Sequence, residues 1–138
     1  MLKHPGPTYL RCGRPKVPVV HTGDLKFEIG KAIQVRKGKD VTIIANGIMV
    51  AAALDAAHEL AAEGIDVRVI DMHTVKPIDE EAIVRAAEQT KGIVVAEEHL
   101  AAGGLGAAVA SVVTRTAPTR MAYVNLGDRY AESGDPDG

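Results

Sequence analysis

Three apolar segments decide the fold of this chain: residues 41–47 (VTIIANG), 67–79 (VRVIDMHTVKPID) and 92–99 (GIVVAEEH). Two of them are rich in β-branched residues, and each apolar run ends on polar residues. Helical segments of about fifteen and about ten residues separate them. Strands that alternate with helices in this way are typical of βαβ units, in which the strands run parallel. The sequence therefore predicts an α/β domain.

Local signals place the helices and the last strand. Residues 48–63 carry apolar side chains at spacings of three and four, which predicts a helix that Gly64 terminates. Asp79 is suited to cap a second helix of about ten residues, because its carboxylate can accept a bond from a first-turn backbone N–H. A third helix is predicted over about residues 104–116 and a last strand over residues 121–125 (MAYVN).

The first forty residues are less regular. Prolines and glycines interrupt residues 1–30, so only residues 8–11 (TYLR) make a candidate strand there. We interpret residues 1–30 as a linking segment that carries the last strand of a domain absent from the chain. Residues 31–36 (KAIQVR) are a further strand candidate, and the polar turn 37–40 favours a hairpin with the next strand. Pairing with a non-adjacent strand stays open. The sum is a five-stranded sheet with helices packed on it.

Composition excludes several classes of function. The 138 residues suit one domain, aromatic residues are only 3%, and the formal net charge is −2 without a basic patch. We therefore expect no nucleic-acid partner. No apolar run approaches the roughly 18 residues that span a bilayer, so no membrane partner is expected. The single cysteine, Cys12, excludes an intrachain disulfide and favours a cytoplasmic location.

Polar side chains gather at the predicted carboxyl ends of the strands, where α/β sheets bind their ligands. They are Asn46, Asp71, His73, Glu97, Glu98 and His99. One interpretation is an anion or acid/base site, since histidines titrate near neutral pH. The other is that these groups are helix caps, loop residues or contacts with another protein chain. Adjacent residues of a strand point to opposite faces, so Glu97 and Glu98 do not form an acid/base pair. We find no catalytic motif and no metal-binding spacing in the sequence.

Two further features suggest anion binding. The run Gly103-Gly104-Leu105-Gly106 precedes the third predicted helix, and helix N-termini bind anions. The run matches neither GxGxxG nor a P-loop, so a tight turn with close helix–sheet packing is the alternative. Arg11 and Arg14 lie in a segment rich in Pro and Gly and could clamp a phosphate or carboxylate. A solvated surface is the alternative for both arginines.

Taken in order, the segments resemble the C-terminal end of transketolases, most closely those whose chain is split into two subunits. The motifs are GPTYLRCGRPKVPVV, GKDVTIIANG, EGIDVRVIDMHTVKPID, VVAEEHLAAGGLGAAVASVV and GDRYAESG. The most specific part is IDMHTVKPID followed by EEH and GGLG. Deoxyxylulose-phosphate synthases and the β subunits of 2-oxo acid dehydrogenases are looser relatives with the same C-terminal fold.

The resemblance implies a three-layer α/β/α domain with a five-stranded mixed, mostly parallel sheet, in which KAIQVR is the antiparallel strand. It implies that residues 1–30 are a remnant of the pyrimidine-binding domain plus a linker, and that residues 31–138 are the C-terminal domain. In such enzymes thiamine diphosphate and Mg²⁺ lie between two other domains. We therefore expect neither cofactor on this chain alone, no metal site, and no catalytic residue. The expected partners are an N-terminal transketolase subunit or domains and further copies in a homo-oligomer.

The resemblance also gives roles to residues. Arg14 matches the family arginine that holds the phosphate of the sugar-phosphate substrate, and Arg11 is a weaker candidate for the same role. Independently of the family's motifs, we expect a domain or subunit interface or an anion site at His73, Glu98, His99, Gly103 and Gly104. Three hypotheses follow: the inactive C-terminal portion of a ketol transferase, a stand-alone module that binds an anion or nucleotide, and a structural oligomerising domain.

Overall fold

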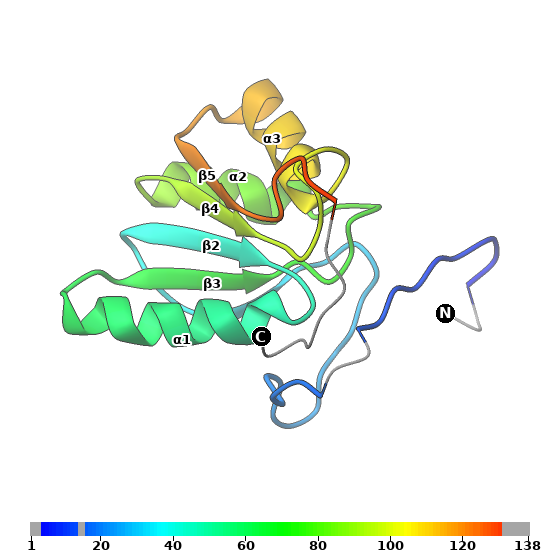
Figure 1. Ribbon diagram of the computed structural model, residues 1–138, viewed down its shortest axis with the longest axis horizontal. Coiled ribbons are helices and arrows are strands. Elements are labelled where there is room, and N and C mark those ends of the chain that lie inside the picture. Colours follow the sequence, from blue (N-terminus) through cyan, green and yellow to red (C-terminus); the bar gives the residue numbers. More distant parts are fainter. Residues whose placement is uncertain (1–3, 14–15, 131–138) are drawn as a thin grey trace.

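The computed structural model describes residues 4–13 and 16–130. Within them one five-stranded sheet has the strand order β1-β3-β2-β4-β5 (Figure 1). In chain order the elements are β1 (Ile33–Arg36), β2 (Val41–Ala45), α1 (Met49–Ala62), β3 (Val67–Asp71), α2 (Glu80–Gln89), β4 (Ile93–Ala96), α3 (Leu105–Thr116) and β5 (Met121–Val124). Strands β2, β3, β4 and β5 are parallel, and β1 is antiparallel. The predicted fold class is confirmed, including KAIQVR as the antiparallel edge strand.

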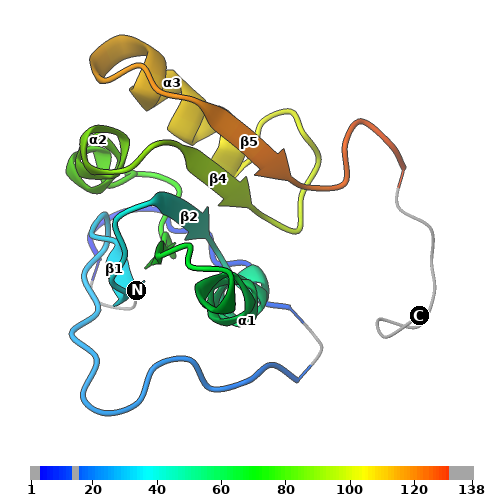
Figure 2. The same ribbon diagram turned by 90° about the vertical axis from the view of Figure 1, so that its left-hand side faces the viewer.

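Helices cover both faces of the sheet, as Figure 2 shows. The face towards α1 buries Ile43, Ala45 and Val69 against small side chains of that helix. The opposite face buries Ile44, Ile70 and Val95 against α2 and α3. Alternate residues of each strand thus enter different cores, because successive side chains point to opposite faces. This is why the strands are apolar throughout, as parallel strands between two helical layers are.

The predicted hairpin between β1 and β2 is wrong, because β1 pairs with β3 instead. The connecting residues 37–40 cross the amino end of β3 to reach β2. A Cβ at Gly38 would lie 2.2 Å from the carbonyl carbon of Val67, so the crossing brings two backbones into contact. Only glycine permits so close an approach. The segment KGKD resembles a hairpin turn, but its glycine serves this crossing.

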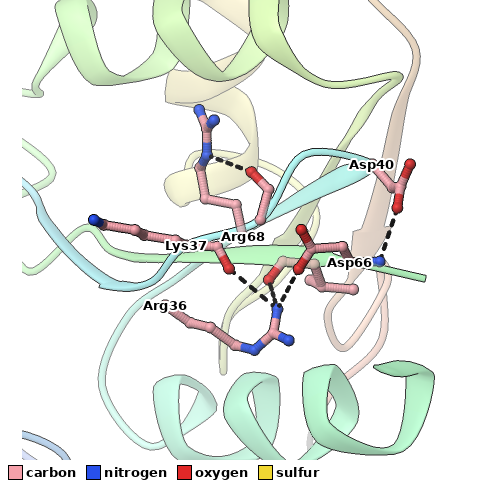
Figure 3. A network of polar contacts seen from close by, with 7 residues as sticks. Arg36, Lys37, Asp40, Asp66 and Arg68 are labelled. Atoms are coloured by element: carbon pink, nitrogen blue, oxygen red, sulfur yellow. Dashed lines mark hydrogen bonds and ion pairs between the residues drawn. The ribbon is translucent and has the colours of Figure 1, made fainter. Parts of the chain in front are cut away.

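Polar contacts fix the crossing (Figure 3). Arg36 donates to the Asp66 carboxylate at 3.3 Å and also to the carbonyl of Val67. The Asp66 amide donates to the Asp40 carboxylate at 2.9 Å, and Lys91 donates to the same carboxylate at 3.1 Å. The backbone bond from Asp66 and then the bond from Lys91 lower the pKa of Asp40 below its ordinary value. This network ties β1, β2, β3 and the start of β4 together at the amino edge of the sheet.

The helix predictions are confirmed to within one or two residues at each end. Asp79 caps α2 as predicted, since its carboxylate accepts from the amide of Ala82 at 3.0 Å. Its second oxygen accepts from the amide of Ala32 at 2.9 Å, which links the cap to the start of β1. Gly64 ends α1 with a positive φ of 82°, as a C-terminal glycine does. None of the helices in the described part of the chain is long and apolar enough to cross a membrane.

Residues 8–11 lie in no strand here, and neither do the other residues of 4–13 and 16–32, so their assignment as the last strand of an absent domain stays a prediction. A strand needs a hydrogen-bonded neighbour, and the described chain offers none to these residues. Tyr9 and Leu10 are instead exposed. In Figure 2 the N-terminal segment, drawn in blue, loops outside the three layers.

Candidate functional site

The parallel strands end on one side of the sheet, and the N-terminal segment lies on that same side (Figure 1). The polar residues predicted at the strand ends therefore lie along one edge. The structure places four of them in three groups: Glu97 with the start of α3, Glu98 with Arg11, and Asp71 and His73 with the N-terminal segment. His99 lies beside Glu98 in the loop after β4. Asn46 joins none of these groups in the described structure, and its carbonyl accepts from the amide of Met49 as α1 begins.

Glu97 is the buried anion at the N-terminus of α3. Its carboxylate accepts from the amides of Leu105 at 2.6 Å and Gly106 at 2.8 Å, and the residue is only 4% exposed. Helix N-termini favour negative charge and have amides without intrahelical partners. The two amides that an external anion would use are therefore occupied by the protein's own carboxylate.

The glycines beside Glu97 make this contact possible. A Cβ at Gly104 would lie 2.2 Å from the Glu97 carboxylate, and a Cβ at Gly106 would lie 2.9 Å from the ring of Tyr123. Both distances are shorter than real Cβ contacts. Close packing of helix on sheet, the alternative that the sequence left open, accounts for these two glycines. Gly103 is exposed, and its role and that of Gly104 at an interface remain predictions.

Glu98 lies in the loop after β4 and is exposed, in contrast to Glu97. Its backbone carbonyl accepts from Nη2 of Arg11 at 3.1 Å, and that nitrogen lies 3.7 Å from its carboxylate. Both side chains are about half exposed, at 56% and 54%. The Nδ1 atom of His99 lies 3.0 Å from the carbonyl of Leu100, and the His99 carbonyl accepts from the amide of Leu126. The loop after β4 is thus tied to the loop after β5, and Arg11 rests on it.

The end of β3 holds the N-terminal segment. Nε2 of His21 lies 2.8 Å from the Asp71 carboxylate, and their side chains are 27% and 11% exposed. The ring of His73 stacks against Phe27 with 4.4 Å between centroids. Its Nδ1 atom is hydrogen-bonded to Oγ1 of Thr74 at 2.8 Å. No local pattern in the sequence marks His21 or Phe27, because their partners lie almost fifty or more residues away in the chain.

Arg14, the strongest substrate-binding prediction, lies outside the described residues. Among the described residues, no group of three or more His, Cys, Asp or Glu side chains could hold a metal ion. The described carboxyl edge of the sheet therefore holds a buried carboxylate that caps α3, an exposed arginine and two contacts to the N-terminal segment.

Comparison with known proteins gives the family. The family model described as "Transketolase, C-terminal domain" matches residues 30–137 of this chain. This chain belongs to that family. It is 46% identical over 138 residues to a 6-deoxy-6-sulfo-D-fructose transketolase subunit from Clostridium sp. (strain MSTE9), covering 99% of this chain and 42% of the relative. It is 40% identical over 136 residues to an apulose-4-phosphate transketolase subunit from Phocaeicola vulgatus, covering 98% and 43%.

A solved structure agrees. This transketolase C-terminal domain superposes on a split-gene transketolase, an inactive β4 tetramer, with a TM-score of 0.81 and 48% identity. The match covers 84% of this chain and 39% of that one. The resemblance stated from the motifs is confirmed. The chain spans less than half the length of these relatives. The comparisons therefore establish the family and the fold of this portion alone.

Proposed function

We propose that this chain is the C-terminal portion of a thiamine-diphosphate-dependent transketolase subunit. The whole enzyme would transfer a two-carbon ketol unit between sugar phosphates. The observation that carries the proposal is the match along 99% of the chain to a subunit of a divided transketolase. The relatives named above act on a sulfonated and a phosphorylated sugar, which supports an anionic sugar as substrate here.

The chain alone is proposed to be inactive and to serve packing and assembly. The described residues supply no metal-binding cluster, so Mg²⁺ and thiamine diphosphate would bind to other domains. The bound cofactor would supply the carbanion chemistry. The proposed partners are an N-terminal subunit and further copies of this chain, in the cytoplasm. Residues 1–30 would belong to the pyrimidine-binding domain and its linker, and residues 31–138 to the C-terminal domain.

Arg14 and Arg11 are the proposed contacts for the sugar phosphate. Arg11 is half exposed, and its pairing with Glu98 is an exposed ion pair of the kind that contributes little stability. Such an arginine can exchange its carboxylate for a phosphate at small cost. The internal use of the α3 amides by Glu97 weighs against the rival hypothesis of a stand-alone module that binds anions at the GGLG turn.

Reconstitution tests the proposal. The chain is mixed with a polypeptide that supplies the pyrophosphate- and pyrimidine-binding domains, with thiamine diphosphate and Mg²⁺, and ketol transfer to an aldose phosphate is measured. We expect turnover only in the mixture. Arg14→Ala and Arg11→Ala should raise KM for the phosphorylated acceptor about tenfold or more, since each lost charged hydrogen bond is worth about 1.5–3 kcal/mol. Lys16→Ala, an exposed cation of the same segment, is the control and should leave KM unchanged. Turnover by the chain alone would contradict its proposed incompleteness.

A further inference from the structure

The segment of residues 16–30, here called the connector, touches the end of β3 at two points. His21 reaches the carboxylate of Asp71, the last residue of β3, at 2.8 Å. Phe27 stacks on the ring of His73, two residues further along the chain. The last residue of β3 and the loop that follows it therefore hold the connector at two points.

Val20 packs partly buried against the core on the α1 side, whereas residues 22–29 between and after the two contacts are exposed. Val19 is 82% exposed, and Lys26 is exposed between the two contacts. The His21–Asp71 contact is less exposed than the Arg36–Asp66 pair, with side chains 27% and 11% exposed against 29% and 43%. The hydrogen bond between Thr74 and the imidazole of His73 fixes the ring against Phe27.

The geometry points to a clasp: we infer that the His21–Asp71 and Phe27–His73 contacts fix the path of the connector and so position Arg11 at the sheet edge. Arg11 lies before the connector in the chain and contacts Glu98 just after β4. In the sheet, β2 separates β4 from β3, where the clasp lies. A segment with exposed side chains and no strand pairing is mobile unless it is tied down. Preorganisation by the clasp removes the ordering entropy that phosphate binding would otherwise have to supply. The part that concerns Arg11 rests on the proposed function, whereas the clasp itself does not.

Limited proteolysis tests the clasp on the chain itself. Trypsin cleaves after Lys26, between the two contacts, when the connector opens. We expect His21→Ala to speed this cleavage about tenfold and Phe27→Leu about threefold, because Phe27 is 55% exposed whereas His21 is mostly buried. Val19→Ala is the matched control and should cleave at the wild-type rate. Asp71→Asn should add little to His21→Ala, since the two changes remove one interaction. The clasp would be overturned if His21→Ala and Phe27→Leu were both cleaved at the wild-type rate. It would also be overturned if the effects of His21→Ala and Asp71→Asn were fully additive.

The assembled enzyme tests the positioning of Arg11. His21→Ala should raise KM for a phosphorylated acceptor about threefold to tenfold. With the unphosphorylated aldose, KM should not change, and kcat should change little with either acceptor. A uniform fall of kcat with both acceptors, or an unchanged KM beside faster proteolysis, would overturn the positioning role. If the wild-type mixture shows no ketol transfer, the proposed function fails, and the proteolysis rates still decide the clasp.

Discussion

Replacement of Glu97 by Gln probes the internal anion at the start of α3. The two amides bind the carboxylate at 2.6 and 2.8 Å in a site that is 4% exposed. Each charged hydrogen bond is worth about 1.5–3 kcal/mol, and the helix dipole adds about 0.3–1 kcal/mol. A carboxamide can accept one amide through its oxygen, but its NH₂ group then faces the other N–H. We therefore expect Glu97→Gln to lower the free energy of unfolding by about 3 kcal/mol.

Chemical denaturation of the chain at neutral pH measures this loss from the midpoint and slope. In thermal unfolding, a loss of that size should lower Tm by on the order of 10 °C for a domain of this length. The control is Glu98→Gln, the adjacent carboxylate that is half exposed, which should change the free energy by about 0.5 kcal/mol or less. Equal losses in the two variants would refute the reasoning, since burial and amide contacts are what distinguish these neighbours.

Three further changes test the amino edge and the start of α2. Gly38→Ala should destabilise the fold by about 2 kcal/mol or more in urea, because the new Cβ overlaps the backbone of Val67; a loss below about 1 kcal/mol, the ordinary effect of a loop substitution, would contradict the crossing. Asp40→Asn should lower the urea midpoint at neutral pH. Because the pKa of Asp40 is lowered in the fold, its contribution is present above the pKa of the unfolded chain and is lost as pH falls through the folded value; the difference from wild type should therefore shrink as the pH falls below the ordinary pKa of an aspartate, and a difference independent of pH would count against this carboxylate. Asp79→Ala should cost about 2 kcal/mol by removing both the cap and the bond to Ala32, whereas Asp79→Asn should retain part of it; equal losses in the two variants would argue against the capping role.

The sequence predicted those elements of the fold that local chemistry determines. The apolar strands, the capping Asp79 and the terminating Gly64 act within a few residues, so the boundaries of α1, α2 and β3 lie close to those expected. The partner of β1 could not be found in this way, because strand pairing depends on contacts distant in the sequence. The glycine of KGKD is compatible both with a hairpin and with a crossing over β3. The resemblance to transketolases supplied the antiparallel edge strand that local patterns left open.

The candidate site, too, was predictable only in the part that does not depend on contacts distant in the sequence. Topology placed the polar residues at the carboxyl edge, but their partners came only with the structure. His21 and Phe27 carried no signal, since a connector histidine or phenylalanine looks like any exposed residue until the end of β3 lies beside it. Glu98 and Arg11, both marked as candidates, do meet, and the exposure of their pair leaves Arg11 able to exchange its partner.

The GGLG turn is the instructive case. Glycines before a helix suggest a site for an external anion, and here they accompany an internal one. The carboxylate of Glu97 takes the amides of Leu105 and Gly106, and it leaves no room for a Cβ at Gly104. The glycines and the buried carboxylate thus form one structural unit, because a larger residue at position 104 would expel the anion that caps α3. An external phosphate would have to displace a buried carboxylate with two charged hydrogen bonds, whereas at Arg11 it would replace an exposed one. This comparison weighs against the turn as an anion site and supports the proposal that Arg11 contacts the phosphate.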